Sequence, residues 1–409
     1  MATGNGGSTP TSEVRFDVKI SRRVQELEES ATIAVGNKAA AMRADGIDVV
    51  SLGAGEPDFD TPEHIVEAAE RSLRAGETKY AKPASGVPLL KQAVIGKLAR
   101  ENGIHYEPSQ VLATIGGKEA LWLAFATLLD PGDEVVIPAP YWVSYPEQVK
   151  LVGGVPVVLE AGAHDAFKVT PSQLKAALTP RTRAFVLNSP SNPTGSAYTP
   201  EEIDALASVL ADHDNVTVIS DEIYDRLLYG GRIHKSYAAV SDHAYAHTIT
   251  FNAGSKTYSM TGWRIGYAAG PTDVIRGMGK LQTQTSSGAA TFTMHSLAAA
   301  LDGDQQCVED MRVEFERRAA FLHQRLNDLP GVTCPAAAGA FYVFPDVSET
   351  YRQLGVTGST PFATKLLEDA HVAVVPGEAF GADGCVRLSF ATSMTNLEAA
   401  LNRIEGFLA

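Results

Sequence analysis

The stretch TITFNAGSKTYSMTGWRIGY, residues 248–267, carries the most informative chemistry in this chain. Its apolar start, residues 248–251, is typical of a buried strand, and Lys256 follows shortly after. A lysine that forms a Schiff base must lie at a fixed place beside a bound carbonyl, with a nitrogen usable well below the ordinary pKa of about 10.4. Arg264 can return to the same place and bind a phosphate as a planar fork. Taken singly, an exposed loop lysine and a strand-edge arginine are the ordinary interpretation.

Short apolar runs alternate with helical segments on the N-terminal side of this stretch. Strands are predicted at residues 110–115, 134–137, 155–159, 184–187 and 216–220, and helices at 63–75, 87–102, 118–129 and 200–211. Such alternation is typical of a mostly parallel sheet with helices on both faces. The predicted fold class is therefore α/β, with a large domain over residues 57–300.

The pattern changes after about residue 300. A long charged helix is predicted at 305–326, strands at 341–344 and 386–390, and a closing helix at 396–407. We expect residues 301–409 to form a smaller α+β domain. Residues 1–12, rich in Gly, Ser and Thr, are expected to be a disordered tail, and residues 13–56 an N-terminal segment that packs with the small domain.

A second strand delivers a carboxylate. In VISDEIY, residues 218–224, Asp221 lies where the strand ends, and open α/β sheets place their ligands at the carboxyl ends of strands. A carboxylate there can keep a pyridinium nitrogen protonated, which makes such a ring an electron sink. Tyr224, three residues on, could hydrogen-bond a ring oxygen. A helix N-cap aspartate with a packed tyrosine explains the segment equally well.

Two loops that follow strands add further polar groups. In NSPSNPTG, residues 188–195, two prolines and a glycine fix an irregular loop that can hold the amide of Asn192 in one orientation. In TIGGKEA, residues 114–120, two glycines join a strand to a helix, so that backbone N–H groups and the helix dipole can bind a phosphate. Neither this loop nor GAGEP, residues 53–57, has P-loop or dinucleotide-binding spacing.

Together and in this order, SKTYSMTGWRIGY, SDEIY and NPTG resemble the fold-type-I aminotransferases that use pyridoxal 5'-phosphate. The resemblance runs from about residue 21 to the C-terminus and is nearest to the aspartate aminotransferases of the bacterial Ib subgroup and their prephenate-active relatives. It implies that Lys256 binds the cofactor covalently and later moves the Cα proton. It also implies that Asp221 pairs with the ring nitrogen, and that Asn192 and Tyr224 contact the ring hydroxyl.

The resemblance implies further cofactor contacts. Gly117 and Lys118 would offer backbone N–H groups to the phosphate, where Arg264 joins them. Trp142, in PAPYWVSYP, matches the aromatic residue that stacks on the ring. Tyr80 matches the tyrosine that reaches the phosphate of the neighbouring subunit, so a homodimer with shared active sites is expected.

The substrate contacts are also implied by the resemblance. Arg387, in CVRLSF, matches the arginine that binds the substrate α-carboxylate, and Gly55 lines the same pocket, as do Asn192 and Trp142. Thr32 and Lys118 match the Ib pair that receives a distal carboxylate. We therefore expect aspartate, glutamate, 2-oxoglutarate and oxaloacetate as substrates, with prephenate converted to arogenate as a further reaction. Many relatives have Pro at the position of Glu29, which leaves the approach to Thr32 less well defined.

Other functions remain open at this point. An aromatic, kynurenine-type or alanine aminotransferase, or a β-lyase, could use the same scaffold. A sensor domain that binds pyridoxal phosphate without turnover is the alternative outside enzymes, but such proteins carry a winged helix ahead of the domain. Only about 20 residues precede the similarity here.

Composition narrows the partners. The net charge of −14 provides no basic field for nucleic acid, and the apolar runs are too short to cross a membrane. Three widely spaced cysteines without a CxxC pair favour a reducing compartment, either bacterial cytoplasm or a plastid stroma. His243 and His247 lack the glutamate of an HExxH motif, so surface histidines and no metal are expected. No GxSxG motif of a serine hydrolase is present.

Overall fold

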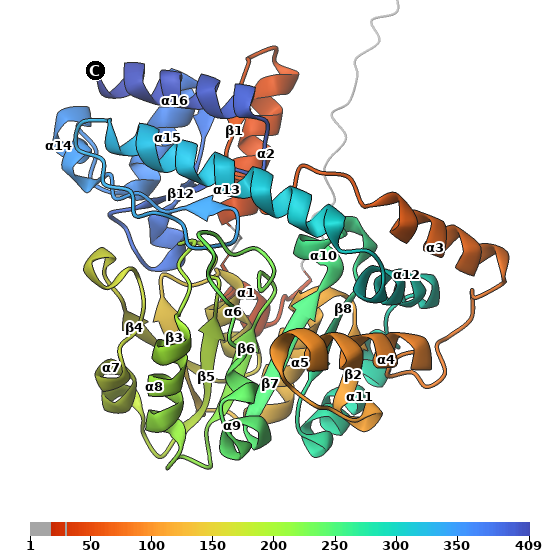
Figure 1. Cartoon of the computed structure of the whole chain (residues 1–409). Coiled ribbons are helices and arrows are strands. Elements are labelled where there is room, and N and C mark those ends of the chain that lie inside the picture. The colour runs from red at the N-terminus through yellow and green to blue at the C-terminus, as the bar shows by residue number, and fades with distance from the viewer. Residues whose placement is uncertain (1–17, 29–30) are drawn as a thin grey trace, which may run out of the picture.

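The computed structural model describes residues 18–28 and 31–409, and its larger unit is built on a seven-stranded sheet (Figure 1). In spatial order the strands are β2 (Val111–Thr114), β8 (Gly266–Ala269), β7 (Thr248–Ala253), β6 (Thr217–Asp221), β5 (Thr182–Asn188), β3 (Glu134–Ala139) and β4 (Val155–Glu160). Neighbours from β7 to β4 pair in parallel, whereas β8 runs antiparallel to both β2 and β7. The predicted α/β class with a mostly parallel sheet is confirmed.

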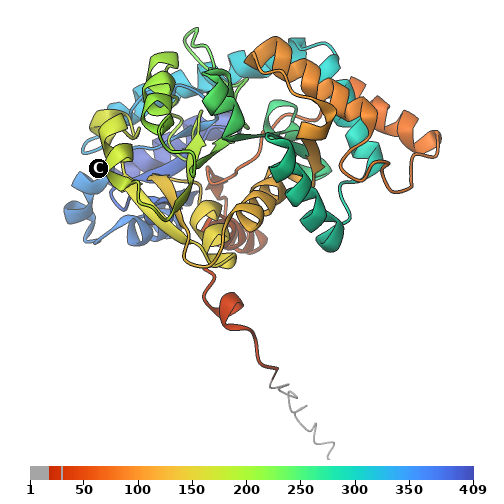
Figure 2. The same cartoon turned by 90° about the horizontal axis from the view of Figure 1, so that it is seen from below.

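Helices cover both faces of this sheet, as the view from below shows (Figure 2). One face packs against α5 (Gly116–Leu128), α6 (Ser144–Leu151) and α11 (Thr272–Thr285). The other face packs against α4 (Pro88–Lys97), α7 (Pro171–Ala177), α8 (Pro200–Leu210), α9 (Asp242–Ala246) and α12 (Thr291–Asp302), and α3 (Glu63–Arg74) lies on α12. The strands are therefore buried on both sides, which explains their nearly continuous apolar sequences.

Strand β8 was not predicted. Its sequence, Gly-Tyr-Ala-Ala, has none of the branched residues that identify the other strands. A small first residue is required, because a Cβ on Gly266 would lie 3.0 Å from the carbonyl oxygen of Asn252. The close approach of β8 to β7 therefore selects a residue that weakens the strand signal.

The C-terminal residues form a second unit with two small sheets. In one, β1 (Val50–Ser51) pairs in parallel with β10 (Val372–Ala373), so a strand from the N-terminal segment joins the C-terminal unit. In the other, β11 (Val375–Pro376), β12 (Val386–Ser389) and β9 (Tyr342–Val343) pair antiparallel. The helices of this unit are α2 (Ala31–Ala44), α13 (Gln306–Asn327), α14 (Tyr351–Leu354), α15 (Ser359–Ala370) and α16 (Met394–Leu408).

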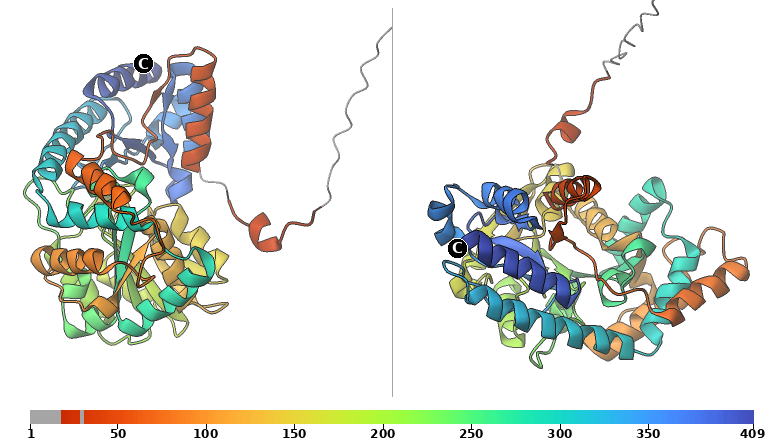
Figure 3. Two further views of the ribbon diagram at one scale, coloured as in Figure 1. Left: turned by 90° about the vertical axis from the view of Figure 1, so that its right-hand side faces the viewer. Right: turned by 90° about the horizontal axis from the view of Figure 1, so that it is seen from above.

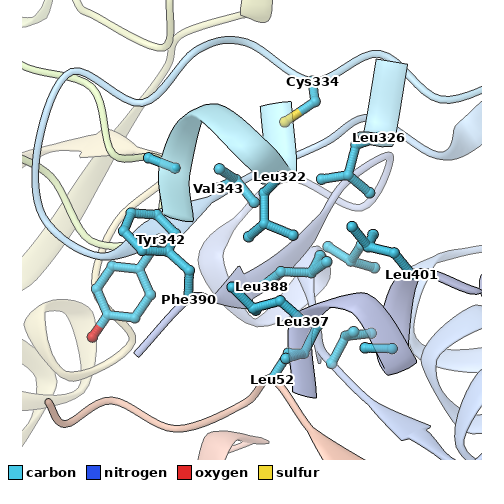
Figure 4. Close-up of a cluster of buried hydrophobic side chains, with 14 of the residues drawn as sticks. Leu52, Leu322, Leu326, Cys334, Tyr342, Val343, Leu388, Phe390, Leu397 and Leu401 are labelled. Carbon is cyan, nitrogen blue, oxygen red and sulfur yellow. The ribbon is translucent and has the colours of Figure 1, made fainter. Parts of the chain in front are cut away.

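Long helix α13 and closing helix α16 lie side by side over this unit, whereas α1 (Arg22–Gln25) extends away from it (Figure 3). Their apolar faces meet strand residues in one buried cluster (Figure 4). Leu322 and Leu326 come from α13, Leu397 and Leu401 from α16, and Leu388 from β12. Burial of each such side chain contributes roughly 1.5–3 kcal/mol, and together they form the base that holds β12.

Within the described ranges, no helix combines the length and apolarity needed to cross a membrane.

All three cysteines are free.

Candidate active site

A cavity of about 240 Å³ lies at the carboxyl ends of the parallel strands, with walls from both units. Open α/β sheets bind ligands at this edge. Ten of the twelve residues predicted for the site line it: Thr32, Gly55, Gly117, Lys118, Trp142, Asn192, Asp221, Tyr224, Lys256 and Arg387. Arg264 lines an adjoining pocket that shares Gly55, Gly117, Lys118, Trp142 and Lys256.

Lys256 enters the cavity from α10 (Gly254–Thr257), which begins where β7 ends. Its Nζ atom donates a hydrogen bond to the carbonyl oxygen of Gly55 and lies 5.7 Å from the ring centre of Phe341. Burial, helped by the positive charges of Arg387 and Arg264, lowers the pKa of this amine to about 8. At pH 7 roughly a tenth of Lys256 is therefore a neutral amine, several-hundredfold more than for an ordinary lysine.

Asp221 is the last residue of β6 and is buried. The hydroxyl of Tyr145 donates to its Oδ2 atom at 2.6 Å, and the backbone N–H of Ile223 donates to Oδ1 at 3.3 Å. Burial raises the pKa of this carboxyl to about 6 despite these hydrogen bonds. Asp221 thus presents an ionised but poorly solvated carboxylate, which an added cation or protonated nitrogen would stabilise.

Asn192 and Arg387 meet although they come from different units. The Nη1 atom of Arg387 donates to Oδ1 of Asn192 at 3.0 Å, and Nη2 donates to the carbonyl oxygen of Gly53 at 2.8 Å. Asn188 fixes the loop, because its side chain accepts a hydrogen bond from the N–H of Asn192 and donates one to the carbonyl oxygen of Asp221. The buried Nε atom of Arg387 has no partner within the described residues. A buried guanidinium with a free donor is suited to an anionic ligand.

The strand-to-helix loop at the start of α5 contacts Arg264. A Cβ on Gly116 would lie 2.6 Å from Nη2 of Arg264, and Gly116 has a φ of +69°. Arg264 itself has a φ of +52° and donates through Nη1 to the carbonyl oxygen of Thr261 at 2.8 Å. The helix N-terminus and a guanidinium therefore face one place, an arrangement that can bind a phosphate.

Lys118 extends across the cavity toward Trp142. Its Nζ atom lies 5.0 Å from the centre of the Trp142 ring, within range of a cation–π interaction. Burial and the charge of Arg264 lower the pKa of this lysine. Thr32 lies in the first turn of α2 and lines the same cavity. Glu29, which precedes this helix, lies outside the described residues.

Tyr80 is 81% exposed and does not line the cavity of its own chain. Its ring is therefore open to contact with another chain.

His243 and His247 lie on and just after α9, and their rings stack with centres 4.2 Å apart. Together with exposed Asp214, their possible ligand atoms lie within 4.8 Å of one another. Both histidines already have protein partners: His243 contacts Asp214 at 3.2 Å, and Nδ1 of His247 lies 2.9 Å from the carbonyl oxygen of His243.

Two tyrosines that line the cavity were not among the predicted residues. Tyr145 binds Asp221, and Tyr342 contacts the hydroxyl of Tyr224 at 3.1 Å and stacks under the guanidinium of Arg387 at 4.6 Å. Tyr145 could have been predicted, because it lies three residues after Trp142, which was already assigned to the site. Nothing in the sequence connected Tyr342 with Tyr224.

A lysine at the end of one strand, an aspartate at the end of the next and a polar helix N-terminus, all on this sheet, define a pyridoxal-phosphate-dependent transferase of fold type I. The family of class I and II aminotransferases matches the chain over residues 47–404. This chain belongs to that family and uses pyridoxal 5'-phosphate as its cofactor.

Several relatives are similar over nearly their whole length. The aspartate aminotransferase of Geobacillus stearothermophilus is 50% identical over 96% of this chain and 99% of its own. The aspartate/prephenate aminotransferase of Cereibacter sphaeroides is 47% identical over 95% and 98%. The structure of the Thermus thermophilus aspartate aminotransferase with maleate has a TM-score of 0.90 at 45% identity, covering 95% of this chain and 99% of that one.

Proposed function

We propose that this aminotransferase moves an amino group between aspartate or glutamate and a 2-oxo acid, either 2-oxoglutarate or oxaloacetate, and that prephenate is a further acceptor that yields arogenate. One observation carries the proposal: a single cavity brings together the amine of Lys256, the carboxylate of Asp221 and the guanidinium of Arg387. The names of the relatives in Geobacillus and Cereibacter support the choice of substrates.

The residues present fit pyridoxal phosphate. The space above Gly116 must stay free of a side chain, the carboxylate of Asp221 is poorly solvated, and the buried Nε atom of Arg387 has a free donor. Lys256 would hold the cofactor covalently, Asp221 its ring nitrogen, and the start of α5 with Arg264 its phosphate. When bound, the cofactor supplies a carbonyl carbon that exchanges amines and a ring that takes up electrons released at the substrate Cα.

Lys256 is proposed to carry the proton between the substrate Cα and the cofactor. An amine with a pKa of about 8 can both accept and return a proton near neutral pH, which an ordinary lysine cannot do efficiently. Its hydrogen bond to the carbonyl of Gly55 holds the amine at one wall of the cavity. Exclusion of water around Nζ limits loss of that proton to solvent.

Asp221 is proposed to hold a proton on the ring nitrogen of the cofactor. Tyr145 and the N–H of Ile223 fix the carboxylate in position. Because burial disfavours its charge, a protonated nitrogen beside it would restore a low pKa. Asn192 and Tyr224 are proposed to contact the ring hydroxyl, and Trp142 to stack on the ring.

Arg387 is proposed to bind the substrate α-carboxylate, and the pair of Thr32 and Lys118 to receive the distal one. Arg387 is held from one side by Asn192 and Gly53 and from the other by the ring of Tyr342, so it approaches its ligand with a fixed orientation. Lys118 supplies a second cation in the same cavity, next to Trp142. Two cations in one cavity favour dicarboxylates over neutral amino acids.

A homodimer with shared active sites is part of the proposal. Tyr80 is 81% exposed here, as expected for a side chain that completes the phosphate site of a second copy. Size-exclusion chromatography with light scattering should give twice the chain mass, and Tyr80→Phe should weaken cofactor retention without changing that mass. We also propose the bacterial cytoplasm as its compartment, in keeping with the bacterial relatives.

The test uses the visible absorption of the purified holoenzyme. Aspartate or glutamate added alone should bleach the cofactor band, and 2-oxoglutarate or prephenate should restore it, whereas alanine should act weakly. This ping-pong pattern follows from two separable half-reactions. Bleaching by alanine or aromatic amino acids in place of the acidic ones would overturn the substrate assignment. Absence of any band after cofactor addition would overturn the role of Lys256.

A further inference from the structure

The segment Asp221–Asp225, sequence DEIYD, points side chains in two directions. Asp221 and Tyr224 line the cavity. Glu222 and Asp225 do not, yet both are buried, with exposures of 2% and 7%. Glu222 and Asp225 therefore have no role in the proposed reaction. They alternate along the chain with Asp221 and Tyr224, which do have one.

Glu222 is fully supplied with hydrogen-bond donors. Its Oε2 atom accepts from Ser236 at 2.6 Å and Asn102 at 3.1 Å and lies 3.0 Å from Nε2 of His234. Its Oε1 atom accepts from Ser220 at 2.8 Å. Such a set, drawn from three separate segments of the chain, fixes the carboxylate and binds its charged form.

Asp225 has its own cation. Its Oδ2 atom accepts from Nζ of Lys97, which also donates to Oδ1 of Asn102 at 2.8 Å. Asn102 lies between the two ion pairs, since its amide donates to Glu222. Lys97, Glu222, Asp225 and His234 thus form one buried network, the four-charge cluster.

The surroundings of all four members favour their charged forms. Burial pushes the pKa of Glu222 and of Asp225 upward, but His234 and Lys97 outweigh it, so both carboxyls titrate below their ordinary values. Burial pushes the pKa of His234 and of Lys97 downward, but the two carboxylates outweigh it, so both titrate above. The cluster therefore consists of two ion pairs, Lys97 with Asp225 and His234 with Glu222, whose charges offset each other.

We propose that Glu222 and His234 are positioning residues for the active site: their buried ion pair anchors the segment that carries Asp221 and Tyr224 and balances the charge behind Asp221. This inference rests on the proposed function of Asp221 as the partner of the ring nitrogen. Other ionisable groups also face this region. Lys256 lies beside Asp221, Glu101 lies beside Lys97 and pairs with Arg226 at 2.6 Å, and the buried phenols of Tyr106 and Tyr267 lie near the two carboxylates.

The charges of His234 and Glu222 predict the direction in which each substitution shifts the pKa values in the active site. Loss of the His234 cation leaves the Glu222 anion unopposed one residue from Asp221, which favours protons on Asp221 and on the cofactor nitrogens. Loss of the Glu222 anion removes that effect, and the imidazole, without its counter-charge, loses its proton as well. Removing both groups should therefore restore what removing His234 alone disturbs.

The test is a pH titration of the visible cofactor band in the holoenzyme for H234N, E222Q and the double variant. H234N should raise the midpoint by at least about 0.5 pH unit, because a unit charge acts over a short, poorly screened path. The double variant should return to within about 0.2 unit of wild type. Lys235→Gln is the matched control, because it removes the charge next to His234 in the chain, which pairs with Asp204 of α8 and not with the cluster.

Two results would overturn the proposal: an unchanged midpoint in H234N, or shifts that add in the double variant, as simple structural damage would produce. Turnover provides a second readout, since H234N should lower kcat several-fold and leave the KM for aspartate within about twofold. Should H234N fail to fold, imidazole NMR of the wild-type chain decides the matter, and a His234 that is neutral at pH 7 contradicts the proposal. A wild-type chain without a cofactor band would instead be a failure of the proposed function.

Discussion

Two lysines of this chain have amines that lie away from solvent, and their surroundings shift the pKa in opposite directions. In the four-charge cluster, Lys97 has an aspartate and an asparagine as partners, and its pKa is raised. In the cavity, Lys256 has one backbone carbonyl and two nearby arginines, and its pKa is lowered. Burial lowers the pKa of both, so the partners decide the difference.

The same contrast separates the two regions as wholes. The cluster leaves one buried carboxylate oxygen, on Asp225, without a partner, whereas the cavity leaves Arg387 with a free donor and Lys118 facing a ring. Charges that satisfy each other stabilise a fold, and charges that lack partners can receive a ligand. Burial of charge is therefore a weak sign of function, and incomplete pairing is a stronger one.

The sharpest way to test this contrast is Lys256→Ala. Loss of the amine removes both the covalent attachment and the proton carrier, so steady-state turnover should fall by at least about 10⁴-fold. The visible band should disappear or shift to that of the free aldehyde. The free energy of unfolding should fall little, since the amine donates its hydrogen bond to the backbone carbonyl of Gly55 and not to a carboxylate. Turnover retained within about 100-fold would contradict the assignment.

The converse change is Lys97→Met. It leaves Asp225 buried without its cation, and breaking such a pair costs about 3–5 kcal/mol. Urea unfolding followed by circular dichroism should show this loss, together with a residual cofactor band. A fully stable Lys97→Met variant would show that the cluster does not hold this part of the fold.

Arg387→Lys tests the free donor of the cavity. A lysine keeps the charge but cannot reproduce the planar fork held by Asn192 and Gly53. Loss of a buried charged contact costs about 2–4 kcal/mol, so kcat/KM should fall about 30- to 1000-fold. The decrease should be equal for aspartate and alanine, because both carry the α-carboxylate. A selective effect on aspartate would place the distal carboxylate here instead.

Lys118→Ala should change selectivity rather than overall activity. It removes the cation proposed for the distal carboxylate, so the ratio of kcat/KM for aspartate to that for alanine should fall about tenfold. An unchanged ratio would remove Lys118 from substrate recognition. Its backbone N–H stays in place, so cofactor retention serves as the internal control.

The lowered pKa of Lys256 predicts a pH dependence for cofactor uptake. Only the neutral amine attacks a carbonyl, so below a pKa of about 8 each added pH unit should raise the rate for the cofactor-free chain nearly tenfold. The rate should level off above that pH. Stopped-flow absorbance between pH 6.5 and 9 measures it, and a steady rise to pH 10 would mean that the cavity does not perturb this amine.

The sequence allowed the parallel part of the sheet to be predicted, because strands such as β6 combine an apolar run with a chemically distinctive end at Asp221. Lys256 and Asn192 were predicted from their own segments and Arg387 from the family resemblance, and the fold brings all three to one cavity. Strand β8 was missed because close packing requires a glycine at its start, and the rest of its sequence, Tyr-Ala-Ala, gives no strand pattern.

Side-chain pairs between residues far apart in the sequence were also not predicted. Tyr145 binds Asp221 from 76 residues away, and Lys97 binds Asp225 from 128 residues away. A tyrosine or lysine in a helix has no local feature that names its partner, since that partner is set by how helices pack on the sheet. Lys97 and Lys256 therefore have different roles, one in an ion pair and one in the cavity, and only the tertiary structure distinguishes them.

The pairing of β1 with β10 has a consequence for how the protein is made. Val50 leaves the ribosome 322 residues before its partner Val372, and at about 5–20 residues per second that is a wait of roughly 15–65 s. All seven strands of the large sheet emerge during this interval, so that sheet can form first. Arg387, on a later strand still, completes the cavity near the end of synthesis, so with the proposed roles a nascent chain should form its cofactor site before it can recognise a substrate.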